Sequence, residues 1–168
     1  GGFYNPAMAK SGDRIYFSST MQGGQGQRDI YYVDIEDEEQ RVWSYPQPVV
    51  ALNTAGDDDW LFVEGDSSLY LSSTVSGESK VYYSHFVDSV WTQPVAMDSI
   101  YNQGMSRNLL ISQGAPALLS DREGGSRIFL YQLRPIVPEP EVVEEPIVIT
   151  FPWTFFLFDF DKSTPGFV

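Results

Sequence analysis

One stretch decides the fold: Arg14-Ile15-Tyr16-Phe17-Ser18-Ser19, an apolar triplet that runs into two serines. The same pattern returns at 68–73 and, with more substitutions, at 117–122. A second apolar segment follows each copy, at 29–32, 80–83 and 127–131. Matched positions recur after 47 to 54 residues. Self-similarity at such a period is the sequence signature of a repeat architecture.

The period and the composition of the segments favour strands over helices. Roughly 40–50 residues is the length of one four-stranded propeller blade. A helical repeat would place apolar residues at i, i+3, i+4 and i+7, whereas these segments are short β-branched and aromatic runs between Gly, Ser and Asp clusters. The runs are apolar on both faces, as in sheets that stack face to face. We therefore predict an all-β fold, a β-propeller of four-stranded blades with about three blades present.

The expected strands can be placed unit by unit. In the first unit they are 4–9, 15–19, 29–33 and 42–43; in the second, 60–63, 69–73, 81–83 and 90–91; in the third, 108–111, 117–120 and 128–131, without a fourth. Matched positions of these strands are predicted to be buried between sheets: Ile15, Phe17, Ile30, Leu69, Leu71, Val81, Ile128 and Leu130. The acidic run 34–39 is predicted to form a solvated hairpin tip, because like charges repel.

The composition changes at Arg134, which suggests three regions. Residues 1–133 hold the repeats, and 134–146 interleave Pro with Glu, as an extended linker does. The third region, 147–168, opens with the apolar stretch 147–160. That stretch contains Pro152 and is shorter than the roughly 20 residues of a spanning helix, so no transmembrane helix is expected. Its β-branched and aromatic residues favour a strand, which needs a pairing partner.

Closure of the propeller stays open at this point. Propellers close with about four to eight blades, and this chain encodes two full units and part of a third. The chain can be a piece of a larger propeller, or two copies can share one ring as a homo-oligomer. Alternatively the stretch 147–160 supplies the missing strand, pairing with a repeat edge in its own chain or in a symmetry mate.

Composition and charge exclude several classes of function. The net charge of −13 argues against a nucleic-acid partner, because phosphate binding needs clustered Lys and Arg. No cysteine is present, so the chain has neither disulfides nor a thiolate metal site, which fits an envelope or secreted protein. Residues 1–4 show no signal-peptide pattern, so the sequence is that of a mature chain or of a piece.

Three candidates for chemistry involve a histidine, a glycine pair and a run of aspartates. His85 is the only histidine and no Gly-x-Ser-x-Gly elbow occurs, so a surface histidine is favoured over a catalytic triad; sites with several histidine ligands are excluded. Gly24 and Gly26 are half of a dinucleotide fingerprint, and they join two strands instead of opening a helix. The run 57–59 consists of three aspartates, which cannot all face one calcium ion, so a turn is favoured.

The remaining candidates are a carboxylate pair and an aromatic series. Glu64 and Asp66 raise the question of a glycosidase pair, which separation and pKa decide. A series of aromatic residues recurs at the blade period, which favours core packing over a sugar-stacking platform: Tyr16, Tyr31, Trp43, Tyr82 and Trp91. We therefore predict no catalytic, cofactor-binding or metal-binding residue, no cofactor and no enzymatic activity.

Several of these motifs resemble a known repeat. Ser120-Asp121-Arg122-Glu123-Gly124-Gly125, followed by Ile128-Phe129, resembles the blade signature of TolB-type β-propellers. The segment from Pro6 to Tyr31 resembles the envelope variant of that repeat, with Ser11 in place of the usual turn aspartate. The third unit has Leu118 where the others have tyrosine. Together these motifs cover residues 4 to about 132.

A second resemblance lies in the tail. Phe158-Asp159-Phe160-Asp161-Lys162-Ser163 is similar to the opening strand of OmpA-like peptidoglycan-binding domains, whose ligand-contacting residues would lie downstream. Propeller, linker and OmpA-like strand in this order resemble envelope proteins of the Bacteroidota, including a component associated with type IX secretion. The resemblance implies a non-catalytic scaffold in the periplasm or at the outer membrane, with envelope proteins and peptidoglycan or glycan as partners. The alternatives are a polysaccharide-acting propeller hydrolase and a glycan-binding surface protein.

Overall fold

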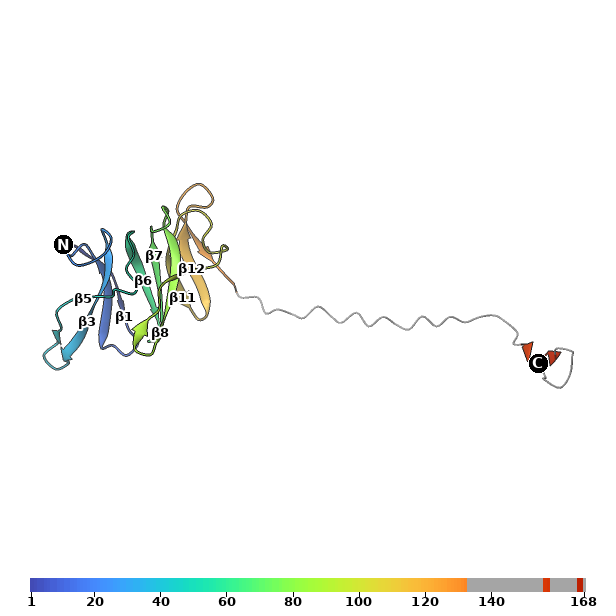
Figure 1. Cartoon of the computed structure of the whole chain (residues 1–168), viewed down its shortest axis with the longest axis horizontal. Helices are drawn as coiled ribbons and strands as arrows, with labels where there is room; N and C mark the ends of the chain where they lie inside the picture. The colour runs from blue at the N-terminus through green and yellow to red at the C-terminus, as the bar shows by residue number, and fades with distance from the viewer. Residues whose placement is uncertain (133–155, 158–165, 168) are drawn as a thin grey trace. The chain divides into compact units, whose positions relative to one another are not determined.

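The computed structural model describes residues 1–132 and the backbone of 156–157 and 166–167. The chain divides into two units, Gly1–Arg134 and Pro135–Val168. The first unit consists of three antiparallel sheets, which follow one another in sequence order (Figure 1). All regular elements of the described residues are strands. The predicted all-β fold of stacked blades is therefore confirmed.

The first two sheets have the same construction. The first contains β1 (Phe3–Met8), β2 (Arg14–Ser19), β3 (Asp29–Asp37), β4 (Val42–Trp43) and β5 (Gln47–Pro48), and both short strands pair with β3. The second contains β6 (Asp58–Glu64), β7 (Ser68–Ser73), β8 (Lys80–Val87), β9 (Val90–Trp91) and β10 (Val95–Ala96), and both short strands pair with β8. The predicted single fourth strand is thus two short strands at the outer edge. The acidic run 34–39, predicted as a hairpin tip, is strand as far as Asp37, and the turn begins at the next residue.

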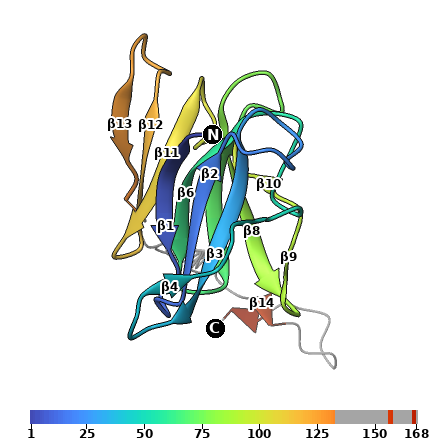
Figure 2. The ribbon, with the colours of Figure 1, turned by 90° about the vertical axis from the view of Figure 1, so that its left-hand side faces the viewer.

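The third sheet has three strands, β11 (Ser106–Ser112), β12 (Ala115–Ser120) and β13 (Arg127–Leu130). Figure 2 shows them side by side, with β13 farthest from the other sheets. In the tail, β14 (Phe156–Leu157) pairs with β15 (Gly166–Phe167). Of the stretch 147–160, the described residues 156–157 therefore pair within the tail, and pairing of this stretch with a repeat edge stays a prediction. The rest of that stretch and the predicted linker 134–146 lie outside the described residues.

The inner strands of the three sheets share one irregularity. Strand β6 packs between β1 and β11, and each of the three is interrupted by a bulge at the same place. The bulged residues are Asn5, Trp60 and Asn108, whose φ angles of 46°, 52° and 53° lie in the left-handed region. A bulge bends a strand and increases its twist. The repeat therefore extends to the backbone conformation of the innermost strands.

The hydrophobic core lies between the sheets. Between the first and second sheets it contains Tyr16, Ile30, Leu69, Leu71 and Trp91, and between the second and third it contains Val81, Leu109 and Leu118. Burying one such side chain stabilises the fold by about 1.5–3 kcal/mol. Of the eight positions predicted to be buried, five are: Phe17, Ile30, Leu69, Leu71 and Val81. Ile15 is half-buried.

Two of the predicted core positions are wrong. Ile128 is 73% exposed and Leu130 is 79% exposed. They pair with Leu119 and Ala117, whereas the buried face of β12 is the one that carries Leu118. Ile128 and Leu130 therefore lie on the face of the third sheet that no neighbouring sheet covers in residues 1–132.

Each of the first two blades closes with an asparagine. The side chain of Asn53 accepts a hydrogen bond from the Ile30 backbone N–H at 2.7 Å and donates one to the Ile30 carbonyl at 3.2 Å. Asn102 does the same with Val81, at 2.7 and 2.9 Å. In each case the segment that leaves the blade is tied to the blade's third strand. The match between the two exits, visible in the sequence as Leu52-Asn53 and Tyr101-Asn102, therefore has a structural cause.

Replacing Asn53 with alanine is expected to lower the free energy of unfolding by about 2–4 kcal/mol, because a buried N–H and a buried carbonyl each lose a partner. Gln103→Ala is the control, because the hydrogen bonds described for Gln103 use its backbone carbonyl. Urea titration of both variants measures the difference. A loss below 1 kcal/mol for Asn53→Ala would show that water replaces the two hydrogen bonds of the Asn53 side chain, which we call the asparagine clamp.

Candidate functional site

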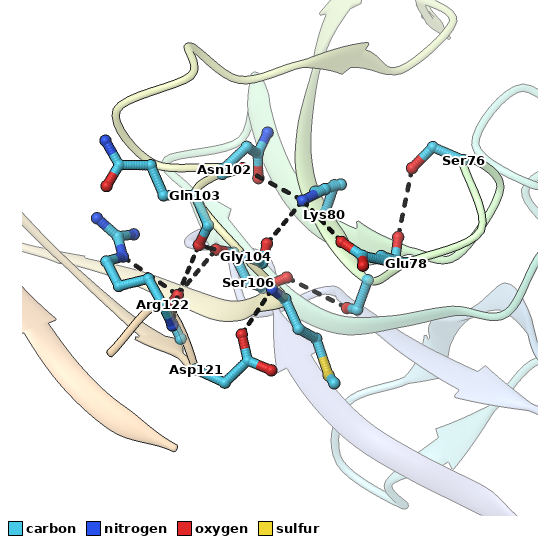
Figure 3. Close-up of polar contacts among 12 residues, drawn as sticks. Ser76, Glu78, Lys80, Asn102, Gln103, Gly104, Ser106, Asp121 and Arg122 are labelled. Atoms are coloured by element: carbon cyan, nitrogen blue, oxygen red, sulfur yellow. Dashed lines mark hydrogen bonds and ion pairs between the residues drawn. The ribbon is translucent and has the colours of Figure 1, made fainter. Parts of the chain in front are cut away.

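The motif Ser120–Gly125 joins the third sheet to the segment that precedes it (Figure 3). Asp121 Oδ1 accepts a hydrogen bond from the Met105 backbone N–H at 2.8 Å. The Arg122 guanidinium donates to the carbonyls of Ile100 and Tyr101, both at 3.0 Å, and its Cζ atom lies 4.4 Å from the Phe129 ring centroid. The Asp121 carboxylate and the Arg122 guanidinium thus both fix the position of the preceding segment. These structural contacts account for the charged residues of the motif.

Lys80 holds the same segment from the second sheet (Figure 3). Its Nζ donates to the carbonyls of Gly104 at 2.7 Å and Asn102 at 3.3 Å, and it pairs with Glu78 at 3.2 Å. The matched position in the first sheet is Asp29, which instead accepts hydrogen bonds from the backbone N–H groups of Gln25 and Gly26. The glycine pair of this loop thus surrounds a carboxylate of its own chain. The dinucleotide-loop interpretation, disfavoured by the sequence, gains no support from this geometry.

The three consecutive aspartates point to different partners. Thr74 Oγ1 accepts from the backbone N–H of Asp57, whereas the fully buried Asp58 carboxylate accepts from the Thr54 hydroxyl and backbone N–H. Asp59, also buried, accepts from Asn5, Ser18, Arg28 and the Trp60 backbone N–H. Within the described part of the chain, no group of three or more His, Cys, Asp or Glu residues could hold a metal ion.

The environment shifts the pKa values of the two buried aspartates in opposite directions. Burial raises the pKa of Asp58, and hydrogen bonds from Ser73 and Thr54 offset only part of this effect. Burial acts in the same sense on Asp59, but its hydrogen bonds from Ser18 and Asn5 together with the Arg28 guanidinium hold the pKa below its ordinary value. Asp59 is therefore an ionised link between blades, because Ser18 lies on β2 and Arg28 lies in the loop between β2 and β3, both in the first blade.

A small polar cavity adjoins Asp59 at the inner strands. Its volume is about 200 Å³, and its lining includes Arg28, Asp59, Ser72 and Arg107. The Nε atoms of both arginines are buried and have no hydrogen-bond partner among the described residues. The Arg28 guanidinium also lies 4.6 Å from the Tyr4 ring centroid. The cavity brings the two arginines together, and the Asp59 carboxylate in its lining is already paired with Arg28.

The other sequence candidates, His85, Glu64 and Asp66, each contact a different partner. His85 is exposed, and its Nδ1 lies 3.2 Å from Ser68 Oγ on the neighbouring strand. Glu64 accepts a hydrogen bond from the Tyr70 hydroxyl, and Asp66 accepts from Ser11 of the first sheet. Glu64 and Asp66 thus accept hydrogen bonds from different partners, one within the second sheet and one from the first blade. Burial and the bond to Glu64 raise the pKa of Tyr70 to about 12.

The aromatic series packs mainly in the core, as predicted. Tyr16, Tyr31 and Trp91 are buried, and Trp43 and Tyr82 are half-buried. Trp91 meets the Tyr16 ring edge-on at 5.8 Å between centroids and donates its indole N–H to the Tyr16 hydroxyl at 3.3 Å. These rings therefore connect the first two sheets.

Two cavities lie at the seam between the first and second sheets, and we call them together the seam groove. Their volumes are about 300 and 290 Å³, and both are lined by Arg14 and Phe86. Besides Arg14, the lining of the first mixes apolar side chains with four polar ones, of which three are aspartates: Ser11, Asp13, Asp34 and Asp66. The second has an apolar lining: Tyr32, Pro48, Val49, Val50, Ala51, Val90 and Trp91, together with Ser89. The groove is therefore acidic at one end and apolar at the other.

Arg14 separates the two ends of the seam groove. Its guanidinium forms two hydrogen bonds with the Asp34 carboxylate, at 2.5 and 2.8 Å, and lies 4.2 Å from the Tyr32 ring centroid. The bond to Asp34 raises the already high pKa of Arg14, so the guanidinium stays charged. Sequence reasoning considered Asp66 only as half of a carboxylate pair and missed the rest of this groove. The matched turns at 11–13 and 65–66 were the available signal.

Antiparallel sheets of this construction, stacked with their inner strands adjacent, define part of a β-propeller. The crystal structure of TolB from Acinetobacter baumannii is a match, with a TM-score of 0.54 and 14% sequence identity. The match covers 76% of this chain and 29% of the TolB chain. The likeness to TolB shows the fold, and this chain spans less than a third of the matched protein's length.

Two further comparisons, with protein-family models and with curated proteins, found no match. Among the described residues, no helix has the length and hydropathy needed to cross a membrane.

Proposed function

We propose that this chain is a non-catalytic interaction module of the bacterial cell envelope, made of blades of a TolB-like propeller that hold other envelope proteins. The observation that carries the proposal is the division of polar groups between the interior and the seam. The buried carboxylates of Asp29, Asp58 and Asp59 all bind groups of their own chain. The seam groove, in contrast, offers an amphipathic surface to solvent.

The fold and one sequence resemblance support the cellular setting. TolB-like architecture favours the periplasm or the outer membrane, and the resemblance at 158–163 favours a peptidoglycan-associated OmpA-like region after the propeller. The proposal extends to a Bacteroidota envelope and to a link with type IX secretion, both of which rest on that order of segments. The gene on either side of this sequence tests this part. An OmpA-like domain downstream and a lipoprotein cysteine upstream are expected, and an intracellular domain on either side would contradict it.

The pKa values of the buried aspartates weigh against the rival function, hydrolysis of polysaccharide. A glycosidase needs one carboxylic acid with a raised pKa beside a second carboxylate, both facing the substrate. Asp59 has a lowered pKa and an arginine partner, and Asp58 has a raised pKa but is fully buried. Neither meets both requirements.

Chemical cross-linking in an envelope extract tests the proposed function. The purified protein is expected to cross-link to a defined envelope protein, with excess unlabelled protein suppressing the product. Release of reducing sugar ends from envelope polysaccharide, measured in parallel, would instead support the hydrolase. Saturable binding of polysaccharide in calorimetry, without a protein cross-link, would support the glycan-binding alternative.

A further inference from the structure

The acidic end of the seam groove carries uncompensated negative charge. Arg14 is the cation in its lining, and Asp34 neutralises it through two hydrogen bonds. The exposed carboxylates of Asp13 and Asp66 each use Oδ1 to accept hydrogen bonds from Ser11, at 2.5 Å and at 3.0 and 3.3 Å. Two carboxylates thus share one serine, and no cation pairs with either among the described residues. Such a pair attracts a positive group.

The apolar end offers surface that a partner can remove from water. Val50 and Val90 are 66% and 62% exposed at its margin; Val90 lies on β9 of the second sheet, and Val50 lies in the turn that follows β5 of the first. Trp91, which is 7% exposed, also lines this end of the groove. Each exposed valine can contribute favourable burial when an apolar side chain covers it, because the hydrophobic effect scales with the apolar area removed from water.

We propose that the seam groove binds an extended peptide segment of a partner protein, in which a lysine or arginine lies near an aliphatic or aromatic side chain. The cation occupies the acidic end beside Asp13 and Asp66, and the apolar side chain covers Val50 and Val90. This proposal rests on the proposed function as an interaction module and names the chemistry of the partner. An acidic segment is excluded by charge, since the groove and the chain as a whole are negative.

Synthetic peptides test the proposal on the full chain. The probes are fluorescein-labelled octapeptides of serine and threonine with one lysine and one valine at varied spacing; the control peptides replace lysine with glutamate or valine with serine. Anisotropy is expected to show a preference of at least about tenfold for the lysine–valine peptides, falling as salt increases. Equal binding of the glutamate peptides, or equal binding of free lysine amide, would overturn the proposal.

Variants locate the binding. The double variant Asp13→Asn/Asp66→Asn is expected to weaken lysine–valine binding about tenfold and to remove most of its salt dependence. Val90→Ser, at an exposed position, is expected to weaken it several-fold without changing the salt dependence. The control Glu78→Gln/Glu123→Gln removes the same number of exposed charges at residues that do not line the seam groove, and it should leave binding unchanged. Equal losses in both double variants would overturn the proposal, because they would show an effect of net charge alone.

The cross-linking and peptide experiments together distinguish failure of the seam-groove proposal from failure of the proposed function. If the chain cross-links to an envelope protein while the peptides do not bind, the interaction function stands and the seam groove is not its site. If the peptides bind and the groove variants remove that binding, the recognition chemistry stands whichever envelope protein carries the segment.

Discussion

Replacing Asp59 with alanine is expected to lower the free energy of unfolding by about 3–5 kcal/mol, the cost of leaving a buried ionic network without its anion. Asp59 is 4% exposed and accepts hydrogen bonds from Asn5, Ser18 and Arg28. Asp57→Ala is a matched control two positions earlier, because the hydrogen bond described for Asp57 uses its backbone N–H. Urea titration is expected to show a loss below about 1 kcal/mol for the control. Similar losses in both variants would contradict the assignment.

The pH dependence of stability should distinguish Asp59 from its neighbour. The pKa of Asp59 is lowered by folding, so its contribution to stability is present above the unfolded pKa, about 3.9, and is lost as the pH falls through the folded value. The pKa of Asp58 is raised, so the ionised carboxylate costs stability at neutral pH, and that cost disappears as the pH falls. Asp58→Asn is therefore expected to abolish a gain in stability on mild acidification, and Asp59→Asn to flatten the loss at lower pH. Urea titrations between about pH 3 and 7 measure both.

Replacing Phe17 with alanine is expected to cost roughly 3–5 kcal/mol of unfolding free energy, as is usual for a buried aromatic side chain. Phe17 is 7% exposed and lies between Phe3 and Tyr31, with ring centroids 5.5 and 6.1 Å away. The matched control is Phe3→Ala, because Phe3 is 64% exposed in the same aromatic cluster. We expect a loss of about 1 kcal/mol or less for that variant. A loss below 1 kcal/mol for Phe17→Ala would argue against a rigid core at this position.

The sequence repeat made the fold predictable. Because apolar and polar residues do not alternate along the strands, the buried face of each strand was harder to predict. Matched apolar segments such as those at Leu69 and Val81 located the strands and most of the core. On β13 the residues are apolar on both faces, so the sequence held no signal to tell the face of Ile128 and Leu130 from that of Phe129. Whether a face of a sheet is buried depends on whether another sheet packs against it, and the sequence of the strand alone does not show this.

The groove was less predictable than the fold, because stacking creates it. Asp13 and Asp66 are turn residues of two different blades, and each by itself is an ordinary solvated turn aspartate. They share Ser11 only because the two sheets lie against each other. The link between Ser18 and Asp59, 41 residues apart, is hidden for the same reason. A pattern within one repeat cannot show contacts between repeats.

The asparagine clamps have a consequence for how such chains can evolve. Asn53 and Asn102 each fasten the exit of a blade to a strand of that same blade, so the fastening lies inside the unit that is copied. The first serine of each pair, Ser18 or Ser72, contacts the inner strand of the following unit in both cases. A duplicated unit therefore brings its own exit clamp and the serine that meets its successor. Repeats of this kind can be gained or lost whole by recombination, without any new joint having to arise by mutation.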